Sequence, residues 1–258
     1  MPKSCQIGWG FRGKGLFFFA LGIVFLGFPI VGVAQQIVVA STSLAGAIAR
    51  AAGAKEVRVI APEGLTHPPE YDLKPSDLIK VEGAAMVVYG GYEKMVSKLA
   101  DTSKSKNLVA LQIDTATSPE NLITQARKIS KVLRTEKDEE AWEARFMERV
   151  NALQKGLAPF SGKRAAVHFH AQPFARWARL SIIQVFRPGE LTPRAISEAI
   201  AQSPEVVVDI LHLPMAKVIA DNAKCRYIQV INFPGVENTK TLEDLFEYNS
   251  AQLIRAFR

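Results

Sequence analysis

Short apolar runs alternate with helix-forming segments along the chain after residue 35, and this alternation constrains the fold more than any other feature. The predicted strands cover residues 36–40, 57–61, 84–89, 108–113, 164–168, 182–186, 206–211 and 227–231. The predicted helices cover residues 44–52, 75–82, 93–99, 118–133, 138–157, 173–179, 192–201, 214–223 and 244–257. Strands that alternate with helices pack as parallel sheets with the helices on their faces. The sequence therefore predicts an α/β protein.

One long helical segment divides this alternation into two halves. Apolar side chains recur there at helical spacing, a pattern typical of core packing, at Trp142, Phe146, Val150, Leu153 and Leu157. We therefore expect two βα lobes with small parallel sheets, joined by one long helix, with a ligand cleft between the lobes. The predicted boundaries are an N-terminal lobe over residues 35–135, the linking helix over residues 136–160 and a C-terminal lobe over residues 161–258.

The first 34 residues have the features of a secretory signal peptide. Three basic residues precede an apolar run over residues 16–34, which ends in Gly32-Val33-Ala34 with small residues at both positions that a cut after Ala34 requires. An uncleaved membrane anchor is the alternative, because the run is about long enough to span a bilayer. Cleavage would lower the formal net charge from +7 to +4, without the clustered basic patch that nucleic-acid binding needs. We expect a monomeric protein that is periplasmic or secreted and binds no nucleic acid.

Each of the four histidines stands at or just beyond the carboxyl end of a predicted strand. They are His67, His168, His170 and His212. Ligands of open α/β sheets bind at this edge, and imidazole is a ligand that suits zinc, copper, iron and nickel. Because His67 belongs to the first lobe and the others to the second, a cleft between the lobes would bring them together. We predict a metal site of His67, His168 and His212. His170 is either a fourth ligand, a hydrogen-bond donor to one of the ligands, or a surface residue. In a continuing strand it would point to the same side as His168.

Two stretches of the sequence resemble the solute-binding proteins of zinc and manganese ABC transporters. His67 is followed by Tyr71 and by Pro75-Ser76-Asp77, and the run from His168 to Leu180 matches a His followed by an aromatic-rich helix start. The resemblance covers nearly all of residues 36–256. It implies a two-lobed extracytoplasmic protein, not an enzyme, that delivers a divalent transition metal to the membrane permease of an ABC transporter. Zinc is the first candidate, with manganese and iron as alternatives.

The ligand set departs from that family at two of its four positions. Residues 113–119 lack the family's second His, and Asn232 stands where the family has an acidic residue. His212 is a candidate to replace a ligand, and either Glu93 or Asn232 is a candidate to complete the site. A solvated carboxylate is the alternative for Glu93. The alternative function is a binding protein of the same fold for a metal chelate or another small ligand. A metal-dependent hydrolase is less favoured, because the sequence contains no His-Glu-x-x-His or Gly-x-Ser-x-Gly motif.

Overall fold

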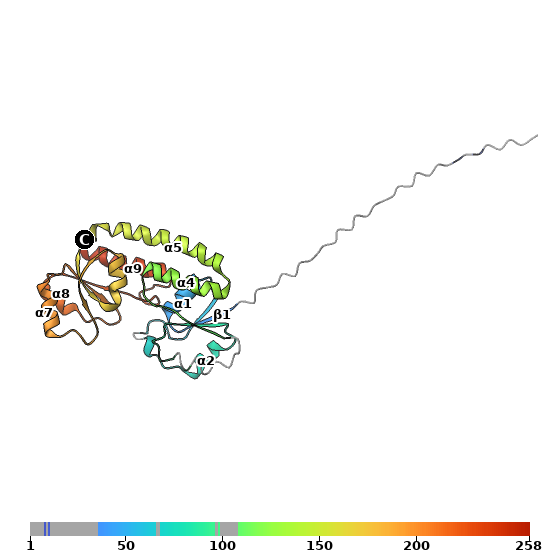
Figure 1. The fold of residues 1–258 in the computed structure, drawn as a ribbon, viewed down its shortest axis with the longest axis horizontal. Coiled ribbons are helices and arrows are strands. Elements are labelled where there is room, and N and C mark those ends of the chain that lie inside the picture. The colour runs from blue at the N-terminus through green and yellow to red at the C-terminus, as the bar shows by residue number, and fades with distance from the viewer. Residues whose placement is uncertain (1–7, 9, 11–35, 66–67, 96–97, 99–107) are drawn as a thin grey trace, which may run out of the picture. The chain divides into compact units, whose positions relative to one another are not determined.

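The computed structural model describes residues 8, 10, 36–65, 68–95, 98 and 108–258. The chain divides into two units, residues 1–33 and residues 34–258, and the second unit carries the fold (Figure 1). Apart from Gly8 and Gly10, the predicted signal peptide over residues 1–34 lies outside the described residues. In the part of the chain that the structure describes, no helix combines the length and the apolar character needed to cross a membrane.

Two four-stranded parallel sheets form the framework of residues 34–258. The first contains β1 (Ile37–Ala40), β2 (Glu56–Val59), β3 (Met86–Tyr89) and β4 (Val109–Gln112), and the second contains β5 (Arg164–His168), β6 (Ser181–Phe186), β7 (Val206–Ile210) and β8 (Arg226–Val230). Their orders are β2-β1-β3-β4 and β6-β5-β7-β8, and every pair of neighbours is parallel. Both sheets thus have the same order relative to the sequence. The predicted α/β fold with two small parallel sheets is confirmed.

Helices cover the sheets, and the longest of them joins the two lobes. The helices are α1 (Ser43–Ala51), α2 (Pro75–Val81), α4 (Pro119–Leu133), α5 (Glu136–Gly156), α6 (Gln172–Trp177), α7 (Pro193–Ala201), α8 (Lys217–Ala223) and α9 (Leu242–Phe257). Helix α5 follows α4 of the first lobe and leads to β5 of the second, and Figure 1 shows it running along α4 and α9. Of the helix predicted over residues 93–99, Met95 and Lys98 are helical, whereas residues 96, 97 and 99 lie outside those described.

A row of aromatic side chains ties the helices of the two lobes into one hydrophobic core. Trp142 stacks on Phe146 within α5 with ring centroids 4.8 Å apart. Phe146 meets Phe246 of α9 edge-on at 5.7 Å, and Phe246 meets Trp177 of α6 at 4.9 Å. Phe146, Phe246 and Val150 are almost completely buried. The predicted core stripe of the long helix is therefore confirmed, and it packs against α9 as well as against the first lobe.

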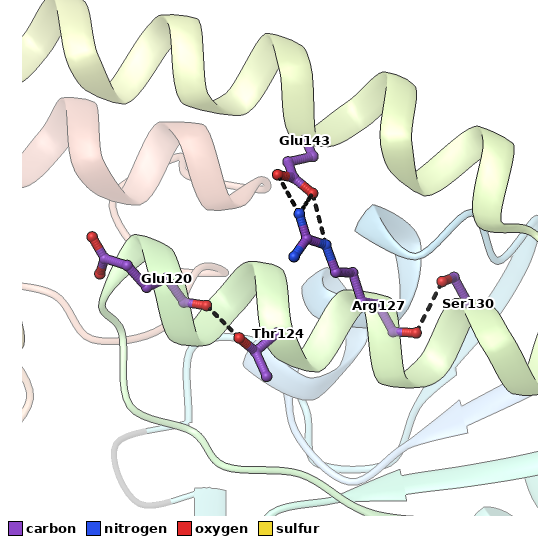
Figure 2. A network of polar contacts seen from close by, with 5 residues as sticks. All are labelled: Glu120, Thr124, Arg127, Ser130 and Glu143. Atoms are coloured by element: carbon purple, nitrogen blue, oxygen red, sulfur yellow. Dashed lines mark hydrogen bonds and ion pairs between the residues drawn. The ribbon is translucent and has the colours of Figure 1, made fainter.

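An ion pair joins α4 to α5 on the outside of this core. The guanidinium of Arg127 on α4 donates from Nε to Oε2 of Glu143 on α5 at 2.9 Å and from Nη2 to Oε1 at 2.6 Å (Figure 2). The hydroxyl of Ser130 donates to the Arg127 carbonyl one turn earlier at 3.0 Å. Because Arg127 is more than half exposed, this ion pair contributes little to stability.

One helix begins later than predicted, and a polar side chain at the end of a strand is the reason. Helix α8 begins at Lys217 instead of residue 214, because the Asp209 carboxylate holds the N–H groups of Met215 and Ala216 in the preceding turn. Strand β5 ends at His168, as predicted, and does not continue to His170. Residues 169–171 form a 3-10 turn whose N–H at residue 170 donates to Nδ1 of His168.

Candidate functional site

A cavity of about 690 Å³ is lined by segments that follow the carboxyl ends of strands in both sheets. The strand order places a switch point between β1 and β3 in the first sheet and between β5 and β7 in the second, and open α/β sheets bind their ligands at such points. Thr42 after β1 and Tyr92 after β3 line the cavity from the first lobe. His170 after β5 and His212 after β7 line it from the second. The predicted cleft between the lobes is present.

Two of the four histidines predicted as metal ligands, His170 and His212, line the cavity. His168 is not among the lining residues. His67 lies outside the described residues, although Pro68, its neighbour in the sequence, lines the cavity. Among the described residues, no three His, Cys, Asp or Glu side chains are grouped so that they could hold a metal ion. The convergence of His67, His168 and His212 on one metal therefore stays a prediction.

His168 is completely buried at the end of β5, with one ring nitrogen unsatisfied. Its ring lies edge-on to Phe186 at 5.6 Å and 5.5 Å from the ring of His170. Nδ1 accepts the N–H of residue 170 at 3.1 Å, so in the neutral ring the remaining proton is on Nε2. Nε2 is buried and has no hydrogen-bond partner within the described part of the chain. Before Nε2 can bind a metal it must lose this proton.

The environment of both histidines after β5 keeps them neutral. Burial lowers the pKa of His168 to about 4; the Asp209 carboxylate opposes this shift and the neighbouring His170 adds to it. Partial burial also lowers the pKa of His170, whose ring lies edge-on to Phe169 at 5.2 Å. Only a neutral imidazole has a lone pair for a metal, so both rings have the ligating charge state at neutral pH.

His212 is positioned by a buried carboxylate three residues before it. Asp209 is completely buried, and its Oδ1 accepts the N–H of Ile210 at 2.9 Å. Its Oδ2 accepts the N–H groups of Met215 and Ala216, each at 2.8 Å. These bonds close the turn that carries the His212 ring to the cavity, where it lies 5.0 Å from the ring of Phe233. Asp209 therefore stabilises the turn, and both of its carboxylate oxygens already accept hydrogen bonds.

Glu93 is a buried carboxylate, so the solvated alternative for this residue is wrong. It is 5% exposed, and its Oε1 accepts the hydroxyl of Ser41 at 2.6 Å and the N–H of Gly90 at 2.8 Å. Its Oε2 accepts the N–H of Gly91 at 2.7 Å. These bonds connect the turn after β3 to the end of β1. Glu93 thus holds in place the segment that presents Tyr92 to the cavity.

Asn232 lines the cavity, but its Oδ1 is itself inaccessible to solvent and accepts no hydrogen bond from any described residue. The backbone just before it is fixed from α9, because the Asn249 side chain accepts the N–H of Ile231 and donates to its carbonyl, each at 2.8 Å. Buried polar atoms in native structures are nearly always paired. The Oδ1 of Asn232 is therefore an unpaired acceptor beside the cavity, and its surface is not exposed to it.

Most of the lining residues were not among the predicted site residues, and three of these supply charge or aromatic walls. Arg176 on α6 is the one charged side chain in the described lining, counting histidine as neutral, and its Nη2 donates to Gln172 Oε1 at 3.2 Å. Tyr92 and Phe233 add aromatic walls. Tyr92 and Phe233 stand just after predicted strands, and this position could have identified both as site residues. Arg176 lies within a helix, and the direction in which α6 points depends on tertiary packing that the sequence pattern does not contain.

The comparisons with known proteins agree with this geometry. A family model described as zinc-uptake complex component A, periplasmic (ZnuA), matches residues 38–211. A periplasmic metal binding protein from Candidatus Liberibacter asiaticus is 14% identical with a TM-score of 0.70, over 87% of this chain and 100% of that one. The SBP FpvC from Pseudomonas aeruginosa in complex with Mn²⁺ is 17% identical with a TM-score of 0.65, over 86% and 98%. No curated protein matches the sequence. At such identities the structural likeness shows the fold alone.

Proposed function

Because the chain belongs to the family of periplasmic component A proteins of zinc-uptake complexes, we propose that it binds a divalent transition-metal ion in the cavity between its two lobes. The observation that carries this proposal is the pair of imidazoles, His170 and His212, that lines the cavity after β5 and β7. Imidazole nitrogen is a common ligand of zinc and also suits iron, nickel and copper. Zinc is the first candidate cargo. Manganese is the second, since a structural relative is described as Mn-bound.

We further propose that His67 and His168 complete the ligand set. His67 is the only histidine of the first lobe, so a metal bound to it and to His212 would connect the lobes. His168 contributes through Nε2, which is buried without a partner in the described residues. A metal that displaced the Nε2 proton would satisfy this nitrogen. The 3-10 turn at residues 169–171 would then have to give up its hydrogen bond to Nδ1, because the proton moves there.

The metal is cargo in this proposal, and the protein makes or breaks no bond. An exported binding protein of this family would hold the ion in the periplasm and pass it to the membrane permease of an ABC transporter. The basic head, the apolar run and the small residues before Gln35 support export. We expect the binding protein to act as a monomer.

Zinc-dependent thermal stability tests the proposal. The protein is exported from its full-length gene, purified without an affinity tag, stripped of metal and heated with and without Zn²⁺. At a hundredfold excess over the dissociation constant, binding stabilises the native state by about 2.7 kcal/mol, which raises the Tm of a chain of this size by roughly 5–10 °C. His67→Ala and His212→Ala should each lose most of this gain. Below about pH 6 the gain should shrink, because protonated imidazoles do not bind metals.

A matched control is Asn151→Ala on the exposed face of α5, which should keep the full zinc-dependent gain. A variant with all four histidines replaced that still shows the wild-type gain would refute the proposed site. Wild-type protein with no gain for Zn²⁺, Mn²⁺ or Fe²⁺ would refute the proposed function.

A further inference from the structure

The cavity has no acidic side chain among the described residues that line it. Its charged lining residue is Arg176, and the two lining histidines, His170 and His212, contribute no negative charge. The two buried carboxylates nearby, Glu93 and Asp209, already accept hydrogen bonds at both oxygens. A bare divalent cation would therefore enter a cavity that offers it no negative charge. Charges leave water at a large cost unless they are paired, so this lining disfavours an uncompensated ion.

The electrostatic features of the cavity suit an anion instead. Residues 115–118, which precede the 15-residue helix α4, line it, and so does Thr42, the N-cap of α1. Helix N-termini carry partial positive charge, and its effect adds to that of Arg176. A guanidinium presents N–H donors in a fork that matches a carboxylate, and Arg176 uses one of them on Gln172. An acidic group of a ligand would find its counter-charge here.

The size and the walls of the cavity point to an organic molecule. Its volume of about 690 Å³ lies within the roughly 300–1,000 Å³ of ordinary small-molecule sites. A single water takes up about 30 Å³ of liquid, so a hydrated ion would leave most of this space unused. Phe169, Leu213 and Phe233 supply apolar walls, and the Arg187 guanidinium lies over the Phe169 ring, 4.2 Å from its centroid.

We propose that the cavity takes its metal as a complex with an anionic organic chelator. A carboxylate of the chelator pairs with Arg176, and its carbon frame lies against Phe169 and Phe233. His170 and His212 bind at coordination positions that the chelator leaves open. The inference rests on the proposed function, because the metal remains the cargo and only the form in which it arrives is specified.

Equilibrium dialysis with zinc and nitrilotriacetate tests the inference. Nitrilotriacetate is a carboxylate chelator that leaves coordination positions open on the metal, whereas ethylenediaminetetraacetate encloses the metal. Metal and radiolabelled chelator retained by the exported, metal-free protein are both counted. We expect the zinc–nitrilotriacetate complex to be retained with equal amounts of metal and chelator, at least roughly tenfold more tightly than Zn²⁺ alone or chelator alone. The zinc–ethylenediaminetetraacetate complex should bind more weakly, because the imidazoles cannot reach its metal.

Substitution at Arg176 separates this inference from simple metal binding. Arg176→Met should weaken retention of the complex by roughly tenfold and should not weaken retention of Zn²⁺ alone, because it removes a positive charge from the cavity lining. The control Arg194→Met, at an exposed residue of α7 that pairs with Glu198 at 2.7 Å, should change neither. Zinc retained without chelator, with no effect of Arg176→Met, would overturn the inference and leave the proposed function standing. Retention of neither form, or of chelator without zinc, would overturn the proposed function together with the inference.

Discussion

Replacing Asp209 by asparagine tests how far the second lobe and its cavity depend on one buried carboxylate. Asp209 lies at the end of β7 and is completely inaccessible to solvent. It accepts four hydrogen bonds, from the N–H groups of Ile210, Met215 and Ala216 and from the hydroxyl of Tyr227. Burial, together with the Asp209 carboxylate, raises the pKa of Tyr227, so the phenol remains a donor. The carboxylate is thus surrounded by donors alone.

Asparagine has nearly the same shape but only one acceptor oxygen. If its carbonyl keeps the three donors at Oδ2, its NH₂ group faces the N–H of Ile210, and one charge-assisted bond is replaced by two opposed donors. The other three bonds lose their charge assistance. Bonds to charged groups contribute about 1.5–3 kcal/mol each and are not additive, so we expect a loss of about 3 kcal/mol in the free energy of unfolding. For a chain of this size, the Tm should fall by roughly 6–12 °C.

Urea unfolding at pH 7, followed by tryptophan fluorescence, measures this loss as a lower midpoint with an unchanged slope. The control is Asp221→Asn on α8, where an exposed carboxylate pairs with Lys217 at 2.6 Å and the expected change is below about 0.5 kcal/mol. Zinc should also stabilise Asp209→Asn less than wild type, because the turn that carries His212 is loosened. A midpoint within about 1 kcal/mol of wild type would show that the turn after β7 is held by other contacts.

Three further predictions follow from buried groups. In metal-free protein, His168 has a pKa of about 4 when folded and an ordinary value when unfolded, so the unfolded state binds the extra proton between these values. The free energy of unfolding is therefore highest above about pH 6.5 and declines toward pH 4, by about 3 kcal/mol in total. Urea midpoints should show this decline in wild type and not in His168→Gln. Glu93→Gln should lose about 2 kcal/mol, measured in the same way, since both carboxylate oxygens accept buried bonds. Phe146→Ala should lose about 3–5 kcal/mol, whereas Phe169→Ala, at a partly exposed ring, should lose far less; equal losses would contradict the assigned core.

The positions of the strands were predictable, because a buried parallel strand must be apolar on both faces. Val206–Ile210, which is buried throughout, was predicted within one residue. The edge of the sheet that binds a ligand was also predictable, since ligands of open α/β sheets bind at the carboxyl ends of the strands. The direction of side chains just past a strand was not predictable in this way. His168 caps a 3-10 turn that separates it from His170, and one hydrogen bond from a backbone N–H decides this arrangement.

The location of the cavity and its chemistry have separate origins in this chain. The location follows from two sheets with the same strand order, because the lining segments follow the strands at the switch point of each sheet. It also depends on the shared core that includes Phe146 and Phe246. The chemistry follows from a few residues in turns and in α6, and those positions can change without disturbing either sheet. A lining with Arg176 and Asn232 and without a described carboxylate is therefore compatible with the family fold while favouring a different form of cargo. Membership of the family predicts where this protein binds, and the charges of its own lining determine what it can bind.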